Sequence, residues 1–92
     1  MDFIYDEKKN QILFEKRGLT FEQAIEIISD EGVLLDFQHP NSEAYPNQRM
    51  MVISINHYPH CIPYIVDGEN FVLKTIFKDR RFKYLLENIN EN

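Results

Sequence analysis

Cysteine is almost absent from this sequence of 92 residues, and tryptophan is absent altogether. Cys61 has no second cysteine to pair with, which excludes an internal disulfide, a Cys-x-x-Cys redox motif and a thiolate zinc site. Long apolar runs are missing too, since a stretch such as Met50–Ile53 is far too short to cross a membrane. The first residues include Asp2 and Asp6 rather than a basic segment and an apolar one. We therefore expect a cytoplasmic protein without a targeting segment or membrane contact.

The composition is that of a folded protein. Hydrophobic residues make up 43% of the chain and charged residues 27%, close to the globular average, which disfavours disorder and coiled-coil structure. Seven phenylalanines and five tyrosines provide material for a core. Because 92 residues suffice for one domain and no linker or repeat is visible, we expect a single domain over residues 1–92.

The charges are unevenly distributed along the chain. The net charge of −5 argues against a nucleic-acid binder, which usually has a basic footprint. From Thr20 to Asn70, however, there are eight acidic residues and one basic residue, whereas Lys74 to Lys83 holds five basic residues and one acidic residue. The chain is therefore electrically polarised, and its basic segment can meet an anion that the rest would repel.

Two helices are predicted in the first third of the chain. Asp6 can cap a helix over residues 7–17, which Gly18 would end in a left-handed conformation. Thr20 and Gln23 form a capping box for a second helix. The apolar residues of that helix recur on one face, at Phe21, Ala24, Ile25 and Ile28.

The rest of the chain reads as strands followed by one helix. Apolar residues alternate over residues 33–37, and a polar loop with two prolines is expected over residues 40–48. Three β-branched or aromatic runs follow, at residues 49–55, 61–66 and 71–77, separated by Asn56-His57-Tyr58-Pro59 and by Asp67-Gly68-Glu69-Asn70. A closing amphipathic helix is indicated by Phe82, Leu85, Leu86 and Ile89. We therefore predict an α+β fold with two N-terminal helices, a four-stranded antiparallel meander and a C-terminal helix.

Basic residues are concentrated where the last predicted strand meets the closing helix. Strand alternation predicts one face with Phe71, Leu73, Thr75 and Phe77, and the other with Val72, Lys74, Ile76 and Lys78. The next basic residues are Arg80, Arg81 and Lys83. Guanidinium and ammonium groups bind phosphate oxygens, so this cluster could stabilise a phosphorane-like transition state. A solvated basic face is the alternative interpretation.

Three further candidates lie outside that segment. Lys16 and Arg17 end the first predicted helix, where cations can equally well complement the helix dipole. His39 can act as a general acid or base near neutral pH, or it is simply a histidine in a surface turn.

Sequence motifs for a metal or cofactor are missing. His57-x-x-His60-Cys61 resembles a metal-ligand spacing, but it straddles a turn, lacks a third ligand and puts its last two residues on opposite strand faces. There is no Gly-rich phosphate loop, His-Glu-x-x-His helix or nucleophile elbow. We therefore expect no metal and no cofactor.

Short patterns that belong together are spread over nearly the whole chain. The first are Phe3-x-Tyr5-Asp6-x-x-Lys9-Asn10 and Glu15-Lys16-Arg17-Gly18-Leu19-Thr20-Phe21-Glu22-Gln23-Ala24. The others are Leu35-Asp36, His39-Pro40-Asn41, Tyr45-Pro46-Asn47-Gln48-Arg49, Pro63, and Leu73-Lys74-Thr75-Ile76 followed by Arg80-Arg81. Together they closely resemble the BrnT family of type II toxins.

The resemblance implies a RelE-like fold, a ribonuclease activity that arrests translation and growth in bacteria, and a cognate antitoxin. The antitoxin's DNA-binding part would repress the shared operon, and a heterotetramer of toxin and antitoxin is one arrangement of the complex. Phe82 follows the two arginines where the family has a small residue, Asp79 stands beside them, and Tyr5 stands where the family commonly has tryptophan.

The leading hypothesis is metal-independent RNA cleavage, in which a ribose 2′-hydroxyl attacks the adjacent phosphate. Catalytic roles are expected for Arg80, Arg81 and Arg49 as phosphate contacts, with Lys16 or His39 nearest to proton transfer. RNA contacts are expected from Arg17, Lys74, Lys78 and Lys83. The alternative is a catalytically silent module whose basic surface binds an acidic or helical antitoxin segment. A free-standing RNA-binding domain is a third hypothesis.

Overall fold

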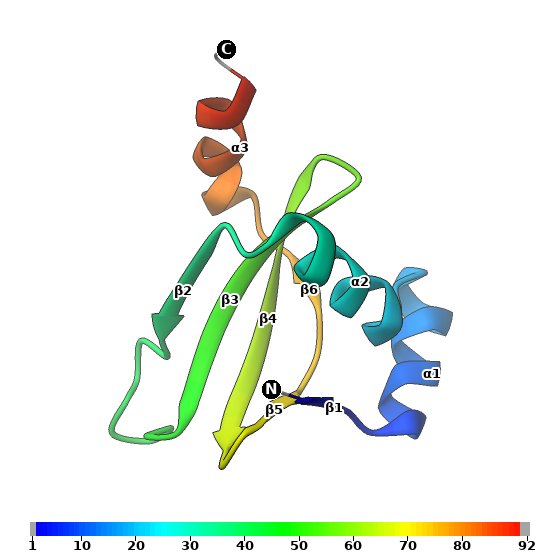
Figure 1. The fold of residues 1–92 in the computed structure, drawn as a ribbon, viewed down its shortest axis with the longest axis vertical. Coiled ribbons are helices and arrows are strands. Elements are labelled where there is room, and N and C mark those ends of the chain that lie inside the picture. Colours follow the sequence, from blue (N-terminus) through cyan, green and yellow to red (C-terminus); the bar gives the residue numbers. More distant parts are fainter. Residues whose placement is uncertain (1, 91–92) are drawn as a thin grey trace.

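The computed structural model describes residues 2–90 and shows a mixed β-sheet with helices packed on it (Figure 1). The helices are α1 (Glu7–Arg17), α2 (Phe21–Glu31) and α3 (Lys83–Asn90), the last preceded by a 3₁₀ turn, η1 (Arg80–Phe82). The strands are β1 (Asp2–Ile4), β2 (Leu35–Gln38), β3 (Gln48–Ile55), β4 (Tyr58–Asp67), β5 (Asn70–Leu73) and β6 (Phe77–Lys78). This confirms the α+β class and the three predicted helices.

The sheet is larger than the predicted four-stranded meander, and it is not wholly antiparallel. Its strand order is β1-β5-β4-β3-β2, and β6 pairs with β4 beyond the end of β5. The additional edge strand β1 runs parallel to β5, with Phe3 opposite Phe71. All the other pairings are antiparallel. Three residues are too few to produce a visible alternation, which is why β1 was not predicted.

The predicted helix caps at Asp6, Gly18 and Thr20 are present. The Asp6 carboxylate accepts hydrogen bonds from the backbone N–H groups of Lys8 and Lys9, at 2.8 and 3.1 Å. Gly18 ends α1 with φ +68°, a conformation that a side chain would strain. The Thr20 hydroxyl accepts from the Gln23 N–H at 3.1 Å and starts α2. Asp6 and Gly18 therefore set the two ends of α1, and Thr20 sets the start of α2.

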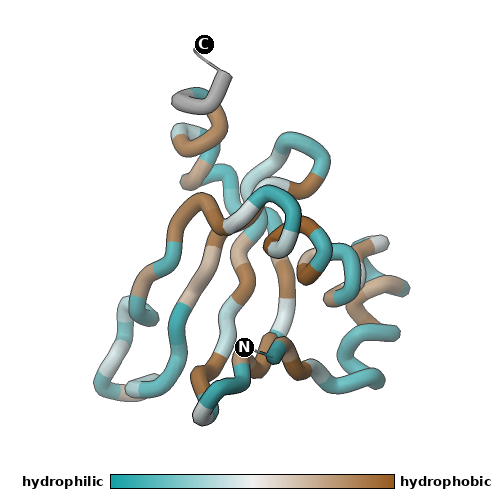
Figure 2. The backbone as a smooth tube through the Cα atoms, viewed as in Figure 1, coloured by the Kyte–Doolittle hydropathy of each residue, from teal (hydrophilic) through white to brown (hydrophobic). Residues whose placement is uncertain are grey.

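The core lies between the sheet and the first two helices. Apolar side chains of both helices and of three strands are nearly inaccessible to solvent, among them Leu13, Phe21, Ala24, Met51, Ile53, Ile62, Leu73 and Ile76. Figure 2 shows brown hydrophobic segments along the strands, whereas α1 is largely teal on its outer side. The opposite face of the sheet is covered near one end by η1, where Phe82 packs on Phe37 with ring centroids 5.9 Å apart. Ile89, predicted on the apolar face of the last helix, lies outside the residues whose side chains are described.

A buried asparagine joins α1 to α2. Asn10 is 7% exposed; its Oδ1 accepts from the Phe21 N–H at 2.8 Å and its Nδ2 donates to Glu22 Oε1 at 2.6 Å. The bond to Oδ1 satisfies the first amide of α2, which has no partner within its own helix, and the bond from Nδ2 adds a contact to the Glu22 side chain.

Replacing Asn10 with alanine is expected to lower the free energy of unfolding by about 1–3 kcal/mol, because the buried Phe21 amide loses its acceptor. Urea unfolding monitored by circular dichroism would measure the change. Gln11→Ala is the matched control, since Gln11 is exposed on the same helix and its side chain donates to Glu15 at 3.3 Å. Equal stabilities of the two variants would contradict a linking role for Asn10.

The β3–β4 hairpin is tighter than predicted. Its turn consists of Asn56 and His57 alone, with φ of +54° and +61°, as in a two-residue type I′ turn. Tyr58 and Pro59, predicted as turn residues, already pair with β3.

An extra residue interrupts the last long strand. Leu73 of β5 lies opposite Tyr64 of β4, and Phe77 of β6 lies opposite Cys61 of β4. The chain therefore advances four residues from β5 to β6 while β4 advances three. The bulge reverses the side-chain alternation. Ile76 therefore enters the core beneath the helices, and Lys78 lies opposite His60 on that same face. The prediction that Phe77 shares a face with Leu73 is wrong for this reason.

Candidate functional site: a basic groove

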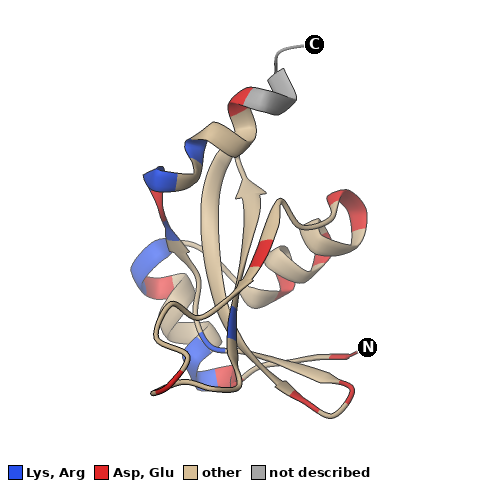
Figure 3. Ribbon diagram, turned by 90° about the vertical axis from the view of Figure 1, so that its left-hand side faces the viewer, with Lys and Arg blue, Asp and Glu red and all other residues tan. Residues whose placement is uncertain are grey.

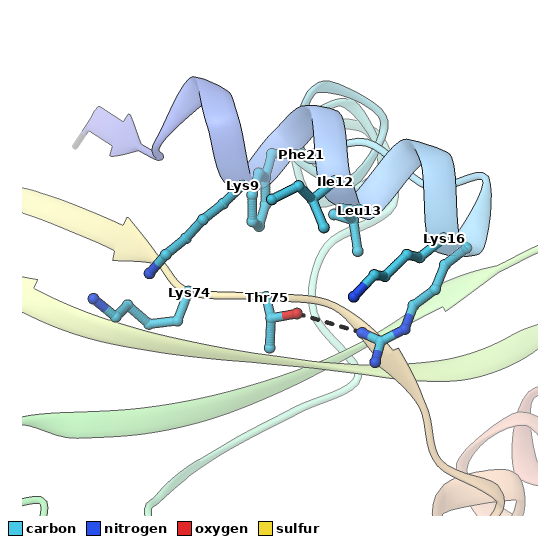
Figure 4. Close-up of a pocket in the computed structure, with 8 residues that line it drawn as sticks. Lys9, Ile12, Leu13, Lys16, Phe21, Lys74 and Thr75 are labelled. Carbon is cyan, nitrogen blue, oxygen red and sulfur yellow. Dashed lines mark hydrogen bonds between the residues drawn. The ribbon is translucent and has the colours of Figure 1, made fainter.

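A groove of about 270 Å³ separates α1 from the bulge between β5 and β6 (Figure 4). Four cationic residues line it, namely Lys9, Lys16, Arg17 and Lys74. Its floor and walls are completed by Ile12, Leu13, Phe21 and Thr75. No carboxylate of residues 2–87 lines the groove, so its charge there is of one sign.

Helical spacing places the groove residues of α1 on one side. Lys9 and Lys16 are two turns apart, and Leu13 between them faces the core. Figure 4 shows Lys9 and Lys74 reaching from opposite walls toward the same end of the groove. Like charges in proximity repel each other unless an anion lies between them, so this end is suited to an anionic group.

Arg17 fixes the far wall of the groove. One of its guanidinium nitrogens donates to the Ile76 carbonyl at 2.7 Å and to Thr75 Oγ1 at 3.4 Å. Arg17 thus supplies a hydrogen-bond donor to a backbone carbonyl of the bulge. The predicted RNA contact of Arg17 is therefore combined with a structural role.

A second cavity, of about 520 Å³, adjoins the first. It is lined by Lys16, Arg17, Leu19, Phe77 and Lys78, so the two cavities share Lys16 and Arg17. Because Lys78 lies on the helix face only through the bulge, the bulge is what brings the cations of the last strand to those of α1. Figure 3 shows most basic residues on one side of the molecule and most acidic residues on the other.

The ion pairs decide which cations are available. Among residues 2–87, the carboxylate pairs of lysine and arginine are Arg49–Asp36 at 3.0 Å and Arg81–Asp79 at 2.6 Å. Lys9, Lys16 and Lys74 of the groove and Lys78 of the second cavity are in neither pair. The groove thus offers uncompensated positive charge, and the sites of the two paired arginines do not.

Arg81 is held by the residue two positions before it. Asp79 accepts from the Arg81 backbone N–H and, through both oxygens, from its guanidinium group, which keeps the pKa of this carboxyl below its usual value. The Asp79 side chain is 9% exposed, whereas the Arg81 side chain is 79% exposed. Arg80 is exposed and belongs to neither ion pair of the described part of the chain.

Arg49 lies apart from Arg81. It is on the face of the sheet that carries the core residues Ile62 and Tyr64, whereas Arg81 belongs to η1 on the other face. Arg49 bonds to Asp36 and to the Tyr64 hydroxyl, and Tyr64 donates to Asp36 at 2.6 Å. Burial, together with the Asp36 carboxylate, raises the pKa of Tyr64 to about 12. This closed network ties β2, β3 and β4 together, and it does not line the groove.

His39 is also remote from the groove, at the end of β2. Its Nδ1 accepts from the Asn41 N–H at 3.0 Å, and its ring packs on Tyr45 with centroids 4.6 Å apart. The structure therefore brings together Lys16, Arg17, Lys74 and Lys78 but separates them from Arg49 and His39. Lys9 and Thr75 were not predicted as site residues; the spacing of Lys9 from Lys16 on one helical face was the available signal.

Lys83 lies near the Tyr58 ring, as does Lys78 of the second cavity. Its ammonium lies 6.0 Å from the centroid of the Tyr58 ring, and that of Lys78 lies 5.7 Å from the same centroid. Tyr58 is thus flanked by two of the predicted RNA-binding lysines, and strand pairing with β3 holds its backbone.

The residues of the metal-like spacing are arranged for packing. His60 is 2% exposed, with Nδ1 2.8 Å from the Tyr58 carbonyl oxygen and Nε2 without a partner. Burial raises the pKa of Cys61 to about 12, and its thiol donates to Asp79. Within the described residues, no three His, Cys, Asp or Glu side chains come together as a metal site.

Protonation of His60 is expected to destabilise the fold. Burial, reinforced by the charge of Lys78, lowers the pKa of His60 from its ordinary 6.5. The unfolded chain therefore binds this proton more readily, and the free energy of unfolding falls as the pH drops below about 6.5. Urea unfolding between pH 7.5 and 5 would show the decline. His60→Leu should flatten it and His57→Asn should not; an unchanged slope in His60→Leu would contradict the assignment.

Between residues 2 and 90, none of the helices has the length and apolar character needed to cross a lipid bilayer. Comparison of the sequence with family models and curated proteins, and of the fold with solved structures, gave no match.

Proposed function

We propose that this chain is a ribonuclease toxin that binds the RNA backbone in the basic groove, as the resemblance to the BrnT family suggests. The observation that supports this most directly is the set of cations from α1 and the β5–β6 bulge, which line one groove together. Phosphate is the anion that RNA presents at every nucleotide, and lysine and arginine are its usual ligands. The cognate partner would be a DNA-binding antitoxin.

The groove suits cleavage by the RNA's own 2′-hydroxyl. The 2′-hydroxyl gives up its proton to solvent water, its oxygen attacks the adjacent phosphorus, the bond to the 5′-oxygen breaks, and a 2′,3′-cyclic phosphate and a 5′-hydroxyl result. Cations around the phosphate stabilise the charge that develops on its oxygens. Lys16 lies in both cavities and is placed to donate a proton to the leaving 5′-oxygen, whereas His39 is too remote for this role. No step requires a metal ion.

A specific observation favours the catalytically silent module as the second candidate. Arg49 and Arg81, two of the arginines expected to contact the transition state, are each bound by a carboxylate and lie outside the groove. Such a module would use the groove for binding alone, with an acidic antitoxin segment as its partner.

Induced expression in a bacterial host tests both candidates. The natural chain, Lys16→Glu/Lys74→Glu, Arg80→Ala/Arg81→Ala and the control Lys8→Glu would be compared for growth and for integrity of total RNA. We expect growth arrest with RNA decay for the natural chain and the control, and neither for the groove variant. Loss of arrest in the Arg80/Arg81 variant alone would move the site to η1. Normal growth with folded, soluble natural chain would favour the silent module.

A further inference from the structure

Tyr58 lies beside two adjoining basic cavities, together called the channel here, which share Lys16 and Arg17. The channel begins between Lys9 and Lys74, passes Lys16 and Arg17, where the two cavities meet, and reaches Lys78. The Lys78 ammonium lies over the Tyr58 ring, so the aromatic side chain follows directly on the last cation of the second cavity.

The Tyr58 ring is held in place but not covered. Its backbone pairs with Ile55 at the two-residue turn, and its ring meets His60 edge to face, with centroids 6.0 Å apart. The side chain is partly exposed. The two lysines near the ring, Lys78 and Lys83, are on flexible stems and can move aside when a ligand approaches.

A fixed aromatic ring between two lysines that form no ion pair within residues 2–87 is suited to a nucleobase with its two flanking phosphates. The base stacks on the ring, and the ammonium groups swing from the ring to the phosphate oxygens on either side. An acidic peptide would use the cations but would gain nothing from the flat π-face. A duplex keeps its bases stacked on each other, so its bases are not available to the ring.

We propose that Tyr58 is a base-stacking residue for single-stranded RNA that lies along the channel from Lys9 to Lys83. This inference rests on the proposed function, because it assumes that RNA is the ligand of the groove. The affinity for oligonucleotides should rise with length until the strand reaches from the groove to Tyr58.

Fluorescence of 2-aminopurine in a short oligouridine tests the stacking directly. The natural chain should quench the probe and bind the RNA, and Tyr58→Phe should do the same. Tyr58→Leu keeps an apolar side chain but no π-face; we expect it to lose the quenching and to bind about tenfold more weakly. Tyr45→Ala is the matched control, because Tyr45 is an exposed tyrosine in the loop before β3.

The possible outcomes separate the two proposals. If the natural chain binds no RNA, the proposed function fails. If it binds RNA but Tyr58→Leu, shown to be folded by circular dichroism, binds and quenches equally well, only the stacking role is overturned. Equal competition by polyglutamate and by single-stranded RNA of the same charge would also overturn it, because the channel would then recognise charge alone.

Discussion

Replacing Lys16 and Lys74 together with glutamate is expected to weaken the binding of single-stranded RNA about 100-fold. The two ammonium groups lie on opposite walls of the groove, so the substitutions turn two attractions for phosphate into two repulsions. Fewer counterions are then released on binding. A plot of log K against log salt concentration should become shallower by about 1.4, because each phosphate that is no longer neutralised lowers the slope by about 0.7.

Fluorescence anisotropy with a labelled oligonucleotide, at several salt concentrations, would measure both quantities. Lys8→Glu is the control for each single replacement, because Lys8 precedes Lys9 on α1 but does not line the groove. It changes the net charge of the protein as much as Lys16→Glu does. If Lys8→Glu and Lys16→Glu weakened binding equally, the attraction would come from the overall charge and not from the groove.

Phe21→Ala is expected to lower the free energy of unfolding by about 3–5 kcal/mol. Phe21 is 1% exposed, stacks on Tyr5 with ring centroids 5.1 Å apart, and begins α2 beneath the groove. Removing the ring leaves a cavity between the helices and the sheet. For a small domain with a total stability of about 5–15 kcal/mol, this loss is a large fraction of the whole.

Urea unfolding with linear extrapolation would measure the loss. The control is Phe14→Ala, since the Phe14 side chain on α1 is 59% exposed and should change the stability by less than about 0.5 kcal/mol. A small effect at Phe21 would mean that the helices can close over the vacated volume.

Helix limits and most strand positions could be predicted from the sequence because they depend on neighbouring residues. Asp6, Gly18 and Thr20 act within one helical turn, and the alternation of β3 and β4 reflects burial on a pleated surface. The two-residue turn at Asn56 and His57 was placed only approximately, because four polar or turn-forming residues follow one another there.

The site could be predicted in part. Its cations are visible in the sequence, but the bulge that gathers them carries no glycine and no break in β propensity to reveal it. Regular alternation placed Lys74 and Lys78 together on one face of the last strand. In the structure, which has one extra residue there, Lys74 lines the groove and Lys78 lines the second cavity. The Arg81–Asp79 and Arg49–Asp36 pairs depend on side-chain geometry, which charge counting does not give.

The contact between Arg17 and Ile76 also determines when the groove can form during synthesis. Arg17 and the Ile76 carbonyl are 59 residues apart in the chain, so α1 leaves the ribosome long before its opposite wall exists. At about 5–20 residues per second, that interval is roughly 3–12 s. Pairing of β1 with β5 imposes a similar delay, since Phe3 must wait for Phe71. Under the proposed function, the chain would therefore stay inactive toward RNA until residues 74–78 have left the ribosome.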